Sequence, residues 1–134
     1  MNNRSDFYKP EWSTEQRDWG FCQAVKVGNM VYVSGTTSCG DGFVPEHVGD
    51  FRAQLICTFT KIQETLAHFG LGMSDIVKET MYTRDMAAFV ENADARKSFY
   101  GEGPYPSSTG VEISRLVFPE LLLEVEVVAV DLRS

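Results

Sequence analysis

The fold is decided by the stretch LLLEVEVVAVD, residues 121–131. Side chains alternate between the two faces of a strand. One face of this strand is purely apolar, and we expect it to pack beneath helices: Leu121, Leu123, Val125, Val127 and Ala129. The other face carries Glu124 and Glu126 together with Leu122, Val128 and Val130. This second face is too apolar to be left in water, which predicts that other subunits cover it.

Two further β-rich runs, residues 24–27 and 30–34, flank Gly28-Asn29. Glycine supplies the positive φ that the first position of a II′ turn requires, so the two runs predict a hairpin. Two more strands are expected at about 75–83 and 109–116.

Helical periodicity is clearest after Asp50, a suitable N-cap, and before Gly70, a suitable C′ residue. The apolar residues between them recur at spacings of three and four: Phe51, Leu55, Phe59, Ile62, Leu66 and Phe69. A second helix is expected after Asp85, with an apolar face of Phe89, Ala93, Phe99 and Tyr100. The element order β-β-α-β-α-β-β predicts an α+β protein, with a single mixed sheet and two helices packed on one face.

Length and charge narrow the class of protein. A chain of 134 residues fits a single domain, 1–134, of which residues 1–20 are expected to form an irregular arm. The net charge is −7 and the longest basic cluster is Arg96-Lys97, so no nucleic-acid partner is expected. No apolar run is long enough to cross a bilayer, and we see no secretory signal. The three cysteines are irregularly spaced, which favours free thiols in the cytoplasm.

Motifs for metal or cofactor chemistry are weak. His47 and His68 are isolated, and no Cys or His pair has the spacing of metal ligands, so neither a metal nor a cofactor is expected. The Gly-x-Gly pairs at 70–72 and 101–103 follow helices, where a phosphate loop would follow a strand. Glu124 is the carboxylate of interest, because a carboxylate in a subunit interface can orient water or a substrate group.

Three segments, in the same order along the chain, resemble the RidA/YjgF family. They are VGNMVYVSG at 27–35, residues 54–85 with LAHFG at 66–70 and DIVKET at 75–80, and PYPSSTGVEISRL at 104–116 followed by LEVE at 123–126. The resemblance covers roughly residues 18–131. It implies a chorismate-mutase-like fold and a homotrimer, in which the sheets form a central barrel with small-molecule clefts between subunits.

The same resemblance implies an activity. Characterised relatives hydrolyse reactive enamines and imines, the products of pyridoxal-phosphate dehydratases, to 2-oxo acids and ammonia. In those relatives an Arg in a Pro-Ala-Arg motif binds the substrate carboxylate, and a Glu in the last strand positions water. A guanidinium suits this task because its fork meets a carboxylate bidentately. Some relatives are described as ribonucleases or translation inhibitors.

Carried over residue by residue, the family site is altered in this chain. The family Glu falls on Glu124, and the family Ser-Gly falls on Ser34-Gly35. The carboxylate-binding Arg falls on Ser108, and the neighbouring Cys falls on Gly110. The pocket Tyr falls on Phe21, which would form an apolar wall.

Arg115 matches another family Arg, and two roles stay open for it: an ion pair at a subunit contact, which we favour, or a substitute carboxylate clamp. Charged hydrogen bonds contribute roughly 1.5–3 kcal/mol each, so loss of the family Arg weakens binding of a small carboxylate. The hydroxyls of Ser108 and Thr109, with the space left at Gly110, instead favour a larger or uncharged ligand.

Three functions follow. The favoured one is a RidA-like trimer that binds a small molecule and hydrolyses an enamine, imine or related bond, with Glu124 orienting the water. The alternative is a non-catalytic ligand-binding or regulatory trimer. Endoribonuclease activity is disfavoured by the net charge of −7 and by the lack of a catalytic His pair.

Overall fold

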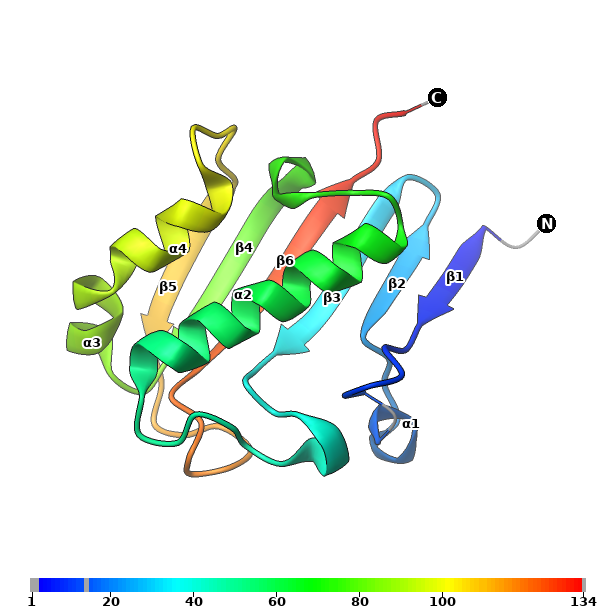
Figure 1. Cartoon of the computed structure of the whole chain (residues 1–134). Helices are drawn as coiled ribbons and strands as arrows, with labels where there is room; N and C mark the ends of the chain where they lie inside the picture. Colours follow the sequence, from blue (N-terminus) through cyan, green and yellow to red (C-terminus); the bar gives the residue numbers. More distant parts are fainter. Residues whose placement is uncertain (1–2, 14, 134) are drawn as a thin grey trace.

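The computed structural model describes residues 3–13 and 15–133. Its centre is a six-stranded sheet in the order β1-β2-β3-β6-β4-β5 (Figure 1). The strands are β1 (Arg4–Phe7), β2 (Ala24–Val27), β3 (Met30–Thr36), β4 (Ile76–Thr83), β5 (Ser107–Glu112) and β6 (Leu123–Val130). β5 runs parallel to β4, and the other neighbours are antiparallel. The predicted mixed sheet is therefore confirmed, with β6 in its interior.

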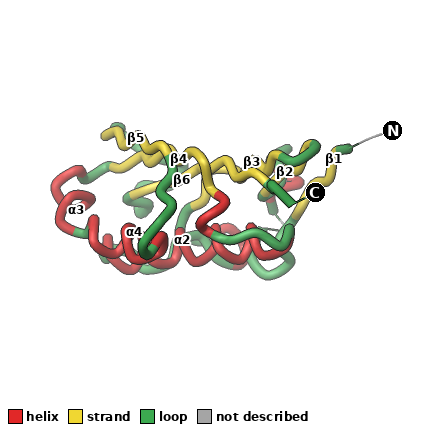
Figure 2. Tube along the Cα trace, turned by 90° about the horizontal axis from the view of Figure 1, so that it is seen from above, coloured by secondary structure: helices red, strands yellow, loops and turns green. Residues whose placement is uncertain are grey.

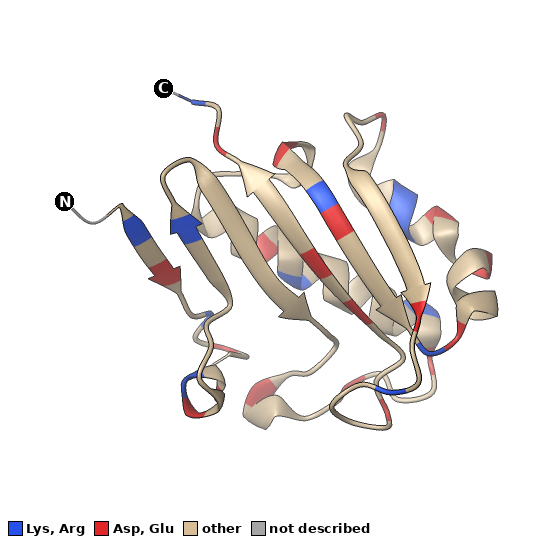
Figure 3. Ribbon diagram, turned by 180° about the vertical axis from the view of Figure 1, so that it is seen from behind, with Lys and Arg blue, Asp and Glu red and all other residues tan. Residues whose placement is uncertain are grey.

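The helices are α1 (Gln16–Trp19), α2 (Phe51–His68), α3 (Met86–Glu91) and α4 (Ala93–Tyr100), with short 3-10 turns η1 (Asp41–Phe43) and η2 (Met73–Asp75). Figure 2 shows α2, α3 and α4 on the same side of the sheet. The opposite side, which we call the open face, is seen directly in Figure 3. None of the described helices has the length and apolar character needed to span a membrane.

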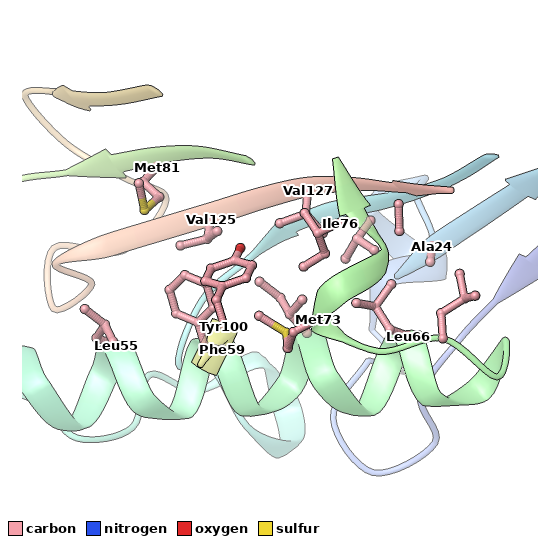
Figure 4. Packing of buried hydrophobic residues seen from close by; sticks show 14 of the residues in the cluster. Ala24, Leu55, Phe59, Leu66, Met73, Ile76, Met81, Tyr100, Val125 and Val127 are labelled. Carbon is pink, nitrogen blue, oxygen red and sulfur yellow. The ribbon is translucent and has the colours of Figure 1, made fainter. Parts of the chain in front are cut away.

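β6 alternates as predicted between a buried and a half-buried face. The face beneath the helices is buried at every predicted position: Leu121, Leu123, Val125, Val127 and Ala129. Figure 4 shows Leu55, Phe59 and Leu66 of α2 on the side of the helix that faces the sheet, where Val125, Val127 and Ala24 lie. Burying one such side chain contributes about 1.5–3 kcal/mol, so this contact surface fixes which side of the sheet the helices cover.

The ends of α2 form as the sequence predicts. The Asp50 carboxylate accepts a hydrogen bond from the Ala53 N–H at 3.0 Å. At the other end Gly70 takes φ +74°, its N–H donates to the Ala67 carbonyl, and the Leu71 N–H donates to the Leu66 carbonyl. These paired bonds are a Schellman motif, which satisfies the last carbonyls of the helix.

Two predicted elements differ in their bounds. The expected helix after Asp85 is divided at Asn92, whose side-chain amide donates to the Ala88 carbonyl at 2.8 Å, so three helices rather than two cover the sheet. The strand expected at about 109–116 lies instead at Ser107–Glu112. Its ladder ends there because its parallel partner β4 ends at Thr83, opposite Glu112.

The N-terminal residues are more regular than predicted. β1 pairs with β2 and stacks the Phe7 ring on the His68 ring, with centroids 3.9 Å apart. Helix α1 follows β1 in the chain. The polar sequence of Arg4–Phe7 gave no strand signal because β1 is an edge strand held by backbone hydrogen bonds. The expectation of an irregular arm over residues 1–20 is therefore wrong at Arg4–Phe7 and at Gln16–Trp19.

The β2–β3 hairpin turns at Gly28, with φ +60°, as predicted. Further along, the register of β3 on β6 shifts between Val33 and Thr36, which places Ser34 and Gly35 in a β-bulge. A bulge inserts one residue and redirects the neighbouring side chains. This bulge lies beside Glu124 of β6.

Candidate functional site

A cavity of about 310 Å³ lies where the bulge of β3 meets β6 and the N-terminal segment. Its walls include four aromatic side chains, Trp12, Trp19, Phe21 and Phe43. Its polar lining includes Gln16, Gln23, Ser34, Thr36 and Glu124. The volume is at the lower end of the range of small-molecule sites, about 300–1,000 Å³. The structure thus brings four predicted site residues together: Phe21, Ser34, Gly35 and Glu124.

Glu124 fits into this cavity because residue 35 is glycine. A Cβ at Gly35 would lie 2.2 Å from Glu124 Oε2 and 2.8 Å from its Cδ. Within the described chain no N–H or O–H donates to the Glu124 carboxylate. Burial raises the pKa of Glu124, and the nearby charge of Glu126 raises it further. Glu124 is therefore a carboxylate that is free to accept a proton or a hydrogen bond from a ligand or water.

Ser34 and the aromatic residues hold the shape of the cavity. The Ser34 hydroxyl donates to the Cys22 carbonyl at 2.6 Å, which ties the bulge to the segment before β2. The rings of Trp19 and Phe43 meet edge to face, with centroids 5.3 Å apart. Sequence reasoning missed Trp12, Trp19, Phe43 and Gln16, because they come from the N-terminal segment and the η1 loop, where no periodic pattern indicates an inward side chain.

A second cavity of about 240 Å³ shares Glu124 with the first. It is lined by Tyr82, Ile113, Arg115, Leu116, Glu124 and Glu126. The Tyr82 hydroxyl donates to Glu126 Oε1 at 2.6 Å, and this bond raises the pKa of Tyr82. Arg115 has no ion pair with any described residue. Its guanidinium is thus available to an anion beside Glu124.

The remaining predicted residues lie on the edge strand β5. Ser108 and Gly110 pair with Glu79 and Met81, whose side chains are buried under the helices. Thr109 belongs to the open face, opposite Thr80. A single chain therefore does not bring Ser108 and Gly110 to Glu124, which lies on the other side of the sheet.

Ser108 instead belongs to a buried polar cluster around Glu79, whose side chain is 0% exposed. Three side chains donate to the Glu79 carboxylate: Arg96 Nε at 2.6 Å, the Tyr100 hydroxyl at 2.5 Å and the Ser108 hydroxyl at 2.8 Å. Burial raises the pKa of Tyr100, and its bond to Glu79 raises it further. This cluster links β4, β5 and α4, and its role is structural.

One potential set of metal ligands lies outside the two cavities. Ligand atoms of Glu46, His47 and Cys57 lie within 4.8 Å of one another, with Glu46 and His47 exposed. The sequence predicted no metal site, and spacing does not indicate this set because Cys57 comes from α2. None of the three residues lines the Glu124 cavities.

A single mixed sheet with helices packed on one face matches the architecture of YjgF-like α+β proteins. The crystal structure of a YjgF family member from Mycobacterium tuberculosis is similar, with a TM-score of 0.80, 28% identity, and coverage of 95% of this chain and 98% of that one. The crystal structure of Escherichia coli TdcF with bound serine has a TM-score of 0.73 and 29% identity, covering 85% and 88% of the two chains.

Sequence comparison identifies the family. Residues 16–131 match the family model Endoribonuclease L-PSP, so the chain belongs to that family, the RidA/YjgF family indicated by its sequence segments. A 2-iminobutanoate/2-iminopropanoate deaminase of Dermatophagoides farinae is 30% identical over 96 residues, which is 72% of this chain and 74% of the relative.

Proposed function

We propose that this chain is a RidA-like protein that binds a small molecule at Glu124 and hydrolyses an enamine or imine. One observation carries the proposal: Glu124 presents an unpaired carboxylate at the junction of two cavities, one of them walled by aromatic rings. The deaminase name of the Dermatophagoides relative and the serine bound to TdcF support a small nitrogen-containing molecule.

Glu124 would act on water. An enamine first tautomerises to its imine, and water then adds to the C=N carbon while Glu124 accepts a proton. Glu124 returns that proton to the nitrogen, which gives the carbinolamine. Its C–N bond then breaks as the hydroxyl proton passes to the departing nitrogen, so that ammonia leaves and a carbonyl remains. A general base works best when its pKa lies near the working pH, and burial moves the pKa of Glu124 in that direction.

The substrate would differ from that of relatives with the family Arg. Ser108 carries no charge, and its hydroxyl is engaged by Glu79. Arg115 is the cation beside Glu124 and supports the role of a substitute carboxylate clamp. The aromatic walls favour a substrate with a larger apolar group.

We also propose a homotrimer with a central barrel, in which a neighbour covers the open face and the ligand clefts lie between subunits. Tyr32 on this face is 48% exposed in the single chain, and every residue of β5 is exposed. A neighbouring β5 would bring Thr109 and Gly110 to a cleft that the single chain leaves without them. Light scattering should give about three times the chain mass of 15.0 kDa, and a mass of one chain would contradict the trimer.

The three unpaired cysteines support a cytoplasmic location.

A non-catalytic ligand-binding or regulatory protein is the second candidate, favoured by the engagement of Ser108 in the Glu79 cluster. Ribonuclease activity is disfavoured, because the described residues lining the first cavity include no His, Lys or Arg to act on a phosphodiester.

The test generates an enamine in place with a dehydratase and follows release of ammonia and 2-oxo acid. Wild type should accelerate release, and Glu124→Gln should lower the rate about 100-fold or more, the range of general base catalysis. Glu91→Gln, on the exposed surface of α3, is the matched control and should release ammonia at the wild-type rate. Equal rates for wild type and Glu124→Gln would remove the proposed role of Glu124. An inactive wild type with activity gained in Ser108→Arg would instead support the non-catalytic alternative.

A further inference from the structure

Two buried glutamines form a chain that leads to the first cavity. Gln23 is 1% exposed and Gln16 is 7% exposed, and both line the cavity. Gln16 Nε2 donates to Gln23 Oε1 at 2.8 Å. Gln23 Nε2 in turn donates to the hydroxyls of Thr36 at 2.9 Å and Thr65 at 3.3 Å.

The two threonines determine which way both amides face. The Thr36 hydroxyl donates its proton to the Ser34 carbonyl, and the Thr65 hydroxyl donates its proton to the Lys61 carbonyl, each at 2.8 Å. Both hydroxyls are therefore acceptors towards Gln23, which must present its NH₂ group to them. Its oxygen then faces Gln16, which must present its own NH₂ group in turn.

With both amides in this orientation, no hydrogen-bond donor of the described chain faces the Gln16 oxygen. Within the described chain Gln16 Oε1 has no hydrogen-bond partner, although it is buried. A buried acceptor without a donor costs about 1–3 kcal/mol, and buried polar groups in native proteins are nearly always paired. An N–H or O–H group of a ligand in the cavity would supply this donor.

Three other donors of the lining are already used within the chain. The hydroxyls of Ser34 and Thr36 donate to backbone carbonyls, and the indole N–H of Trp12 donates to Glu64 at 3.3 Å. The described lining has no Lys, Arg or His. Gln16 Oε1 and the Glu124 carboxylate are acceptors that the protein leaves open, between aromatic walls that bind an apolar group or a cation.

We propose that Gln16 is a ligand-binding residue whose Oε1 accepts a hydrogen bond from an N–H group of the ligand. The ligand class is an amine, imine or enamine with an apolar or aromatic substituent, and its nitrogen rather than any carboxylate it carries enters this cavity. This rests on the proposed function in placing the ligand beside Glu124, and it assigns the nitrogen end of the substrate to this cavity.

Binding can be measured from intrinsic fluorescence, because the chain has 2 tryptophans and both Trp12 and Trp19 line the cavity. The probes are 2-phenylethylamine, 3-phenylpropanoate and ethylbenzene, which share a ring and differ in the terminal group. The amine should bind at least about tenfold more tightly than the carboxylate, since one hydrogen bond to a charged group contributes about 1.5 kcal/mol or more.

Variants separate this inference from the proposed function. Gln16→Leu should weaken amine binding about tenfold and leave ethylbenzene unchanged. As a neutral carboxylic acid, the side chain of Gln16→Glu can donate its O–H to Gln23 Oε1 and keep its other oxygen as an acceptor, so this variant should retain amine binding. Gln63→Leu, on the exposed face of α2, is the matched control. Equal binding of amine and carboxylate, or equal effects of Gln16→Leu on all probes, would overturn the role of Gln16 alone. If Gln16→Leu does not fold, Gln16→Glu serves instead. Loss of the preference for the amine in that variant would contradict the proposed role of Gln16. No response to any probe would contradict the ligand site itself.

Discussion

Two carboxylates on neighbouring strands of the same sheet have opposite surroundings. Glu79 of β4 points under the helices and receives hydrogen bonds from Arg96, Tyr100 and Ser108. Glu124 of β6 points to the other face and receives none from the described chain. Figure 3 views the sheet from the side that no helix covers and marks the acidic positions along the strands in red.

The difference separates a structural carboxylate from a candidate catalytic one. A buried charge surrounded by donors holds elements together, and its loss is felt in stability. A partly buried charge without donors contributes little to stability and is open to water and ligand. Substitutions in the two environments should therefore affect different measurements.

The largest effect is expected when the buried pair is broken. Arg96→Met leaves the buried Glu79 carboxylate without its cation, which should lower the free energy of unfolding by about 3–5 kcal/mol. Urea unfolding at one fixed protein concentration measures it. Arg52→Met, which breaks the exposed pair of Arg52 with Asp94, is the matched control and should cost under about 1 kcal/mol. Equal losses for the two variants would contradict the structural role of the Glu79 cluster.

A smaller loss is expected on the β5 side of the same cluster. Ser108→Ala removes one of three donors to Glu79, and the exposed position of Ser108 limits the cost to about 1–1.5 kcal/mol. Ser107→Ala, whose hydroxyl donates only to the Val77 carbonyl, is the neighbouring control. If Ser108→Ala abolished enamine hydrolysis at unchanged stability, Ser108 would belong to the catalytic region instead.

Gly35→Ala tests the Glu124 side of the comparison. The added methyl group would overlap the Glu124 carboxylate and displace it, so hydrolysis should fall about tenfold or more with little change in unfolding. Gly49→Ala is no suitable control because Gly49 has φ +80°, whereas Gly72, which has open space around its Cβ position, is suitable. Full activity in Gly35→Ala would show that the position of the carboxylate does not matter.

The smallest effect concerns pH. Burial and Glu126 raise the pKa of Glu124 in the folded chain above its ordinary value of 4.5. Its contribution to stability is therefore fully present below pH 4.5 and is lost as the pH rises through the raised pKa. Glu124→Gln should raise Tm relative to wild type at pH 7, and the gain should disappear near pH 4. A gain that is equal at both pH values would contradict the raised pKa.

The sequence was most informative where a pattern repeats. The alternation of apolar side chains predicted β6, and the spacing of the apolar residues from Phe51 to Phe69 predicted α2. The turn at Gly28 predicted the β2–β3 hairpin. No sequence pattern predicted the strand β1 or the division of the helix at Asn92, because an edge strand and a helix break depend on neighbours far along the chain. The resemblance to the RidA/YjgF family predicted Phe21, Ser34, Gly35 and Glu124, which the structure brings to one cavity.

The sequence by itself determined the α+β class and the family, because periodicity and colinear motifs are local properties of the chain. It also indicated Glu124 as the candidate carboxylate. Only the tertiary structure decided that Ser108 serves Glu79 while Glu124 stays without a donor, and that Gln16 ends a chain of amides with an open acceptor. Those roles depend on which donors lie within hydrogen-bond distance, and residues from β4, β5, α1 and α4 meet only when the sheet and its helices have packed.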